Sequence, residues 1–476
     1  MLFWFVITYW IISVAIGLYA GTRVHNTRDF AIAGRHLPFY MVTATVFATW
    51  FGSETVLGIP ATFLKDNLRG VVADPFGSSL CLILVGLFFA APLYRMKLLT
   101  IGDFYKQRYG RGAEVLTTLA IVLSYLGWVG AQITALGLVF NLLSDGEISK
   151  IAGMWIGSTT ILIYTFFGGM WAVAITDLLQ MVIIVLGMLY IGGEVSSQAG
   201  GVGVVVAHAM EAGKFQFWPN GNLKDVIGFA AAWITIMFGS IPQQDVFQRV
   251  QSSKTIHIAV WATVAGGVLY FFFAFVPMFL AYSATLIDPK MVEELIDTDP
   301  QLILPRLVLE KAPLFAQVMF FGALLSAIKS CASATLLAPS VTFTENIVKP
   351  MLGQMSDQKL LRSMRVVTVI FTILVTLYAV NSRLSIFNMV ENAYQVTLVT
   401  AFIPLLCGVY WKRATNQGAL AAIILGLLVW LGLLLFGPVD SFLPAQFGGL
   451  IASVIGMIVG SLAPQRIRIP AQPHRP

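Results

Sequence analysis

A lysine stands in the middle of a stretch that is otherwise apolar enough to cross a lipid bilayer. The run over 321–340 carries Lys329 near its centre, among small hydroxyl and thiol side chains. A charge at the centre of a membrane helix costs about 3 kcal/mol on insertion scales, so such residues face a bundle interior or a water-filled cavity. Small neighbours allow close helix contact and offer oxygen or sulfur to an ion. The stretch therefore predicts a polar site inside a membrane protein.

Two further stretches place carboxylates beside helix-breaking residues. They read FGSETVLGIP over 51–60 and GSIPQQD over 239–245, with Glu54 in the first and Asp245 in the second. Glycine and proline at this depth free backbone groups, which is tolerated only inside protein or along a cavity. Two broken helices five spans apart are typical of transporters built from inverted repeats, with the binding site at the breaks. The alternative is a pair of kinks filled by neighbouring helices.

The composition excludes an ordinary soluble protein. Of 476 residues, 58% are hydrophobic and 11% charged, and the mean hydropathy is +0.82, whereas soluble domains carry about 25% charged residues. The net charge of +6 is expected to reflect cytoplasmic lysines and arginines, so we expect no nucleic-acid partner. The three cysteines lie in apolar stretches, which favours neither disulfides nor a metal motif. No set of nucleophile, base and oxyanion donors is apparent in the sequence, so we do not expect the protein to be an enzyme.

The elements that position these residues are expected to be membrane helices. Because a crossing needs about 20 apolar residues, the sequence predicts an all-α polytopic protein. The thirteen expected spans are 2–20, 38–63, 73–96, 113–143, 152–167, 171–195, 225–248, 257–287, 314–347, 364–381, 385–411, 417–436 and 446–464. No basic region precedes the first span, so it is predicted to be a retained helix rather than a cleaved signal.

The positive charges predict an orientation. Of the 29 Lys and Arg, 19 fall on the loops of one side, nine on the other, and Lys329 lies within a span. Because cytoplasmic loops are enriched in these residues, the N-terminus is expected outside and the C-terminus inside. We expect an integral plasma (inner) membrane protein in contact with lipid, with 465–476 as a cytoplasmic tail. The sequence does not predict the oligomeric state.

Three motifs carry a resemblance. GGMWAVAITDLLQ over 168–180, SAIKS over 326–330 and YWKRATNQGA over 410–419 resemble signatures of the sodium:solute symporter family. The resemblance covers nearly the whole chain. It implies a single LeuT-like transporter domain over 1–476, with 2–20 peripheral, 38–195 as the first five-helix repeat, 225–411 as the second and inverted repeat, and 417–464 as two peripheral helices. It also implies sodium-coupled import of a small organic solute by alternating access, with no cofactor beyond the coupling ion.

The resemblance also implies a sodium site. Its backbone carbonyls fall on Ala48, Phe51 and Ala327, and its hydroxyl positions fall on Ser330 and Cys331. Sodium is a hard ion that prefers oxygen ligands, whereas Cys331 presents a thiol where relatives have a second hydroxyl. Asp177 matches the acidic residue of the family's Thr-Asp motif, which helps to bind a second cation in some members.

Lys329 stands where relatives have an apolar residue, and three hypotheses follow. Its ammonium replaces the sodium ion, giving a sodium-independent carrier or, if the lysine releases its proton, a proton-coupled one. A bound sodium about 4 Å away would be repelled by roughly 4 kcal/mol at an effective dielectric of 20. Alternatively Lys329 forms a structural pair with Asp177 or Glu391, or it extends to a cavity without a partner.

The solute is expected between the two breaks. The predicted lining residues are Trp50, Ser53, Glu54, Trp128, Gln132, Gln243 and Gln244. Tryptophans beside a carboxylate suit an amine, an amino acid or a quaternary ammonium through cation–π attraction. Trp50 and Trp128 match positions used by the family's choline branch, but Gln243 stands where that branch has a further tryptophan. The alternative is that both tryptophans only pack helices. Two other function classes are an ion channel, which needs a continuous polar pore, and a sensor that binds solute without transport.

Overall fold

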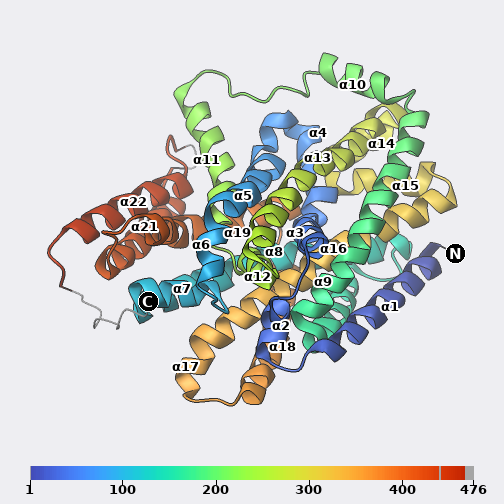
Figure 1. Cartoon of the computed structure of the whole chain (residues 1–476). Helices are drawn as coiled ribbons and strands as arrows, with labels where there is room; N and C mark the ends of the chain where they lie inside the picture. Colours follow the sequence, from blue (N-terminus) through green and yellow to red (C-terminus); the bar gives the residue numbers. More distant parts are fainter. Residues whose placement is uncertain (1, 439–440, 467–476) are drawn as a thin grey trace.

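The computed structural model describes residues 2–438 and 441–466, and every regular element in these ranges is a helix (Figure 1). The sole strand-like feature in this part of the chain is an isolated parallel bridge between Leu37 and Ser253. The predicted all-α class is therefore confirmed. Most of the predicted tail, 467–476, lies outside the described residues.

Ten described helices are long and apolar enough to cross a membrane, or eleven if one bent pair counts as a single span. The ten are Leu2–Arg23, Val72–Arg95, Arg111–Leu143, Lys150–Gln198, Ile256–Ile287, Leu314–Leu352, Asp357–Asn381, Ile386–Tyr410, Asn416–Phe436 and Ala445–Leu462. The 49-residue helix α9 (Lys150–Gln198) covers two expected spans and turns at Gly169, where φ is 47°. The expected span 38–63 is split into short helices. The count of thirteen stays a prediction.

Both predicted breaks are present. Helix α3 (Phe39–Trp50) ends where Phe51 leaves helical geometry, and a π-helical turn, η3 (Glu54–Gly58), leads into α4 (Ile59–Gly70). The second break separates α11 (Leu223–Gly239) from α12 (Gln244–Ser252), which are bent by 44°.

Glycines bring the helices around these breaks into close contact. A Cβ on Gly127, in α8 (Arg111–Leu143), would lie 2.6 Å from the carbonyl oxygen of Met389, in α19 (Ile386–Thr397). A Cβ on Gly239, at the end of α11, would lie 2.5 Å from the carbonyl oxygen of Tyr394. Such distances exclude any larger residue without a shift of backbone. Helix α19 is therefore held against both α8 and α11 at the centre of the molecule.

Other helices lie at the periphery. Helix α1 (Leu2–Ala20) packs against α9, and a Cβ on Gly17 would lie 3.1 Å from the Tyr164 side chain (Figure 1). Helices α21 (Asn416–Phe436) and α22 (Ala445–Leu462) lie together at the opposite side of the view. That these helices lie outside the transporter core stays a prediction. The division of the core into two inverted repeats stays a prediction.

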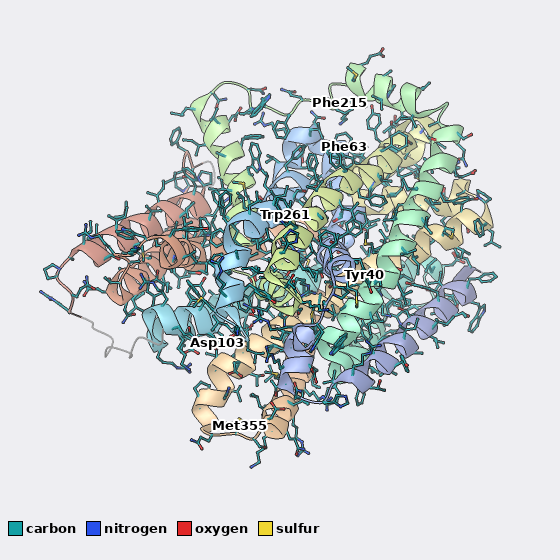
Figure 2. The ribbon with its side chains drawn as sticks, in the orientation of Figure 1. Tyr40, Phe63, Asp103, Phe215, Trp261 and Met355 are labelled. Carbon is teal, nitrogen blue, oxygen red and sulfur yellow. The ribbon has the colours of Figure 1, made fainter. Side chains whose placement is uncertain are left out.

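The loops separate into two ends of the molecule. Figure 2 shows Phe63 and Phe215 toward one end and Asp103 and Met355 toward the other. The short helix α7 (Ile101–Tyr109), which starts with a Thr100–Asp103 capping box, lies at the second end. Which of these ends faces the cytoplasm stays a prediction from the positive charges.

Candidate functional site

Four aromatic side chains, Trp50, Tyr125, Trp128 and Tyr394, meet beside the first break, and we call them the aromatic cluster. The ring centroids of Trp50 and Trp128 are 5.4 Å apart, and those of Trp128 and Tyr394 are 5.5 Å apart. Tyr394 stacks on Trp50 at 6.3 Å and Tyr125 on Trp128 at 6.1 Å. All four side chains are buried. Helices α3, α8 and α19 thus contribute to one aromatic surface.

The residues of the first break converge on Gly52. Gln132 donates from Nε2 to Glu54 Oε2 at 2.7 Å and accepts at Oε1 from the Ser53 amide at 2.8 Å. A Cβ on Gly52 would lie 2.9 Å from Glu54 Oε2, Gln132 Oε1 and Cys331 Sγ. Five of the predicted lining residues therefore lie around one point: Trp50, Ser53, Glu54, Trp128 and Gln132.

The two glutamines of the second break point to different places. Gln243 donates from Nε2 to Ser124 Oγ at 2.9 Å and to Thr397 Oγ1 at 3.3 Å, beside the aromatic cluster. Gln244 accepts at Oε1 from the Ile101 amide at 2.8 Å and so binds the start of α7. The structure therefore does not place Gln244 with the other predicted lining residues, because the bend turns successive side chains apart.

Asp245 was predicted only as a residue beside the second break. In the structure, Asp245 Oδ1 accepts from the Tyr125 hydroxyl at 2.6 Å, which links α12 directly to the aromatic cluster. Arg249 donates to the Asp245 carbonyl at 3.0 Å and to Thr49 Oγ1 at 2.9 Å. Tyr125 lies three residues before Trp128 on α8 and shares its helix face, so the sequence could have predicted Tyr125 at this site.

A second missed carboxylate is Asp74, which is buried on the segment after α4. It accepts at Oδ1 from the Tyr270 hydroxyl at 2.6 Å, and Tyr270 also bonds Thr55 Oγ1 at 3.0 Å. Asp74 lies within an expected span, and an intramembrane carboxylate is by default a functional candidate. The position of Asp74 within a span could therefore have predicted a functional role from the sequence.

The predicted ion-site residues lie between α3, α9 and α16 (Leu314–Phe343). Asp177 Oδ1 accepts from the Ser330 hydroxyl at 2.5 Å, and Oδ2 accepts from Thr45. At the break, the Gly52 amide bonds the Trp50 carbonyl at 3.0 Å, instead of the Ala48 carbonyl that a continuous helix would use. Carbonyl, hydroxyl and carboxylate oxygens suit a hard cation such as sodium. The donor types at Ala48, Ser330 and Asp177 therefore fit the ion.

The remaining predicted ion ligands are also buried. Phe51, Ala327 and Cys331 have no exposed surface, and Cys331 faces Gly52 at the break. In the described ranges no group of three or more His, Cys, Asp or Glu side chains forms a cluster that would hold a metal ion.

The Lys329 side chain makes its direct contacts with α1 and α9 and not with either predicted carboxylate partner. Its Nζ donates to Ser13 Oγ on α1 and lies 4.6 Å from the Tyr164 ring centroid and 5.8 Å from that of Trp10. Within residues 2–438 and 441–466, no ion pair within 4.0 Å joins it to Asp177 or Glu391. The structural pair, one of the three hypotheses for Lys329, is therefore not formed as a direct contact, because the side chain leaves α16 toward the peripheral helix.

Glu391 instead lines polar cavities near the first break. A cavity of about 380 Å³ is bounded by residues of α4, α19 and the segment before it, including Gly58, Asn388 and Glu391. An adjoining cavity of about 710 Å³ shares Lys65, Asp66 and Glu391 with it. The smaller cavity reaches Gly58, the last residue of η3.

Comparisons with known proteins agree on one family. The sequence profile of the sodium:solute symporter family matches residues 30–426. The chain is 27% identical over 456 residues to the high affinity choline transporter 1 of Homo sapiens, covering 89% of this chain and 75% of the relative. It is 25% identical over 458 residues to the sodium/pantothenate symporter of Haemophilus influenzae, covering 91% and 90%.

Solved structures show the same architecture. A Na⁺-coupled sialic acid symporter in a substrate-bound, outward-open state superposes with a TM-score of 0.83 at 20% identity, covering 97% of each chain. MHP1, a nucleobase-cation-symport-1 family transporter, gives a TM-score of 0.62 at 13% identity, covering 91% and 94%. The chain therefore has the LeuT fold.

Proposed function

Because this chain belongs to the sodium:solute symporter family and is a sodium-coupled symporter of a small solute, not an enzyme, we propose that the solute carries an ammonium group. The aromatic cluster is the observation that carries this proposal. Trp50, Trp128 and Tyr394 bring aromatic faces together at a helix break, and a cation over such faces gains about 0.5–2 kcal/mol. An amine or an amino acid has the required charge.

The names of the relatives support this class. Choline, the solute named for the human relative, is a quaternary ammonium compound. Another relative, the osmoregulated proline transporter OpuE of Bacillus subtilis, is named for an amino acid. The pantothenate named for the Haemophilus influenzae relative carries no ammonium, so family membership alone does not select the solute and the residues at the break must.

For the coupling ion, we assign the first sodium to the carbonyls of Ala48, Phe51 and Ala327 with the Ser330 hydroxyl. Asp177 is poised to hold a second cation through its contact with Ser330. Alternating access would open this site to either side of the membrane in turn, with the polar cavities at Glu391 as the outer approach. The protein is an integral multi-pass membrane protein, and we place its N-terminus outside and its C-terminus in the cytoplasm.

A carrier in which the Lys329 ammonium replaces sodium, whether proton-coupled or sodium-independent, is the second candidate. The contact of its Nζ with Ser13 argues against it, because the ammonium is engaged at α1. We therefore assign Lys329 a structural role.

Uptake into proteoliposomes tests the proposed function. Vesicles holding the purified full chain are given radiolabelled ethanolamine, choline, proline or pantothenate under an inward sodium gradient or an equal potassium gradient. Saturable, sodium-dependent uptake of an ammonium compound is expected. Uptake of pantothenate alone would overturn the solute class, binding without uptake would indicate a sensor, and ohmic current would indicate a channel.

A further inference from the structure

The two carboxylates at the helix breaks differ in how their oxygens are used. Glu54 Oε2 is bound by Gln132, whose other end holds the Ser53 amide, so this carboxylate braces the first break. Asp245 uses Oδ1 for the Tyr125 hydroxyl, while its Oδ2 is buried and has no hydrogen-bond partner in the described part of the chain. Asp245 therefore has an unused acceptor, next to the aromatic cluster.

Arg249 does not fill this role. It lies one turn after Asp245 on α12, but it bonds the Asp245 backbone carbonyl and Thr49. Within the described ranges, no ion pair within 4.0 Å joins the two side chains. A buried carboxylate oxygen without a partner is costly, and native proteins rarely leave one unused. The Arg249 Nε is also buried without a partner in the described ranges, so the guanidinium supplies charge near Asp245 but no hydrogen bond to Oδ2. The donor to Oδ2 is thus expected to come from outside the chain.

The surroundings of Asp245 select the kind of donor. A quaternary ammonium has no N–H and is held only by charge and by aromatic faces around its methyl groups. Here one wall of the site is the Gln243 amide, already bonded to Ser124 and Thr397, so that wall offers no aromatic face. An ammonium that keeps an N–H both satisfies Asp245 Oδ2 and uses the faces that remain.

We propose that Asp245 binds the solute directly, accepting at Oδ2 a hydrogen bond from the N–H of a protonated amine that lies against the aromatic cluster. This inference rests on the proposed function and narrows its solute to amines with at least one N–H. Charge-assisted hydrogen bonds of this kind are short and strong. Tyr125 is the positioning residue, because its hydroxyl fixes the other carboxylate oxygen.

Two more groups near the cluster are unused. The Ser53 and Tyr394 hydroxyls are buried and lack partners within the described residues. Each can donate to an oxygen of the same solute. The site therefore suits a small amine that also carries a hydroxyl or carboxylate group, as amino alcohols and amino acids do.

A methylation series tests the proposal. Binding of ethanolamine, N,N-dimethylethanolamine and choline to the purified full chain is measured by thermal shift in sodium at matched ionic strength. The first two keep an N–H and are expected to bind, whereas choline, which lacks one, should bind at least about tenfold more weakly, the scale of one charge-assisted hydrogen bond. Choline binding as tightly as ethanolamine, or no binding of either amine, would overturn the proposal.

Variants separate this result from the proposed function. D245N should weaken ethanolamine binding by about tenfold or more and remove the preference over choline, while the sodium-induced rise in Tm persists. D297N, on an exposed loop aspartate, is the matched control and should change neither. Loss of the sodium response in D245N would reassign Asp245 to the ion and overturn the proposal. Absence of a sodium response in the wild type would instead contradict sodium coupling.

Y125F serves as a second variant if D245N fails to fold, because it keeps the carboxylate. It must lower the preference for N–H amines, and an unchanged preference would count against the assignment.

Discussion

Lys329, in the middle of α16, donates from Nζ to Ser13 Oγ on the peripheral helix α1. The same ammonium lies over the Tyr164 ring, and the Tyr164 hydroxyl donates to the Lys329 carbonyl at 3.1 Å. The charge is thus held on the side of α16 that faces α1 and α9. Asp177 meanwhile receives the hydroxyls of Ser330 and Thr45. The lysine and the proposed ion site use different faces of one helix.

Removing the Ser13 hydroxyl should therefore affect stability more than sodium binding. Ser13→Ala deprives a buried ammonium of its hydrogen-bond acceptor and is expected to cost about 1–3 kcal/mol of folding free energy. The thermal midpoint of the purified protein measures this. Thr8→Ala, an exposed hydroxyl on the same helix, is the control. Equal midpoints for the two variants would contradict the role of the Lys329–Ser13 contact.

The aromatic cluster should determine solute affinity. Trp50→Phe keeps an aromatic face but loses the stronger cation–π attraction of the indole, so the KM for the transported amine should rise about fivefold, equivalent to roughly 1 kcal/mol. Sodium-driven uptake in proteoliposomes measures the KM. Trp4→Phe, at a side chain 70% exposed on α1, should leave it unchanged. An unaltered KM in Trp50→Phe would mean that the tryptophan only packs helices.

Much of the fold was predictable, because the breaks depend on local sequence. Glycine and proline over 51–60 and 239–245 interrupt helices in any packing, and both interruptions are present. Trp50 and Trp128 were predicted to lie together, and they do. The LeuT-like fold was predicted from the family motifs, because residue spacing alone does not determine how helices pair.

The directions of individual side chains were less predictable. A pair of Lys329 with Asp177 or Glu391 was one of three hypotheses, but the rotation of α16 and the position of α1 direct the side chain to Ser13. Gln244 was expected to line the solute site, but the 44° bend turns it toward α7. Both depend on the tertiary arrangement of helices, which a hydrophobic pattern does not specify.

Asp177 should contribute to cation affinity. Asp177→Asn removes a negative charge that contacts Ser330 at 2.5 Å, so the sodium concentration for half-maximal uptake should rise about tenfold or more. Sodium titration of uptake measures this. Glu391→Gln, in the polar cavity, should leave the sodium dependence unaltered. A larger effect at Glu391 would move the second cation to the outer approach.

Gln244 should act as a latch between α12 and α7. Its Oε1 holds the Ile101 amide at 2.8 Å, and Gln251, later on α12, donates to the Leu93 carbonyl at 2.7 Å. Gln244→Leu removes the hydrogen bond to the Ile101 amide. The variant should therefore shift the protein toward the state in which the end of the molecule at α7 is open. When Cys331 is the only cysteine retained, modification of its thiol should be severalfold faster in the Gln244→Leu variant than without this substitution. Gln198→Leu, at an exposed site, is the control, and equal rates would argue against a latch.

The most direct test of the account is thermal melting of the purified full chain in sodium and in potassium at matched ionic strength, for the wild type and Lys329→Met. An ion at a hundred times its Kd stabilises by about 2.7 kcal/mol. We expect a sodium-specific rise in Tm in the wild type, and a rise of the same size in Lys329→Met, because the lysine is bound to Ser13. No sodium response in the wild type, with one appearing in Lys329→Met, would show that the lysine replaces the ion and would contradict the account.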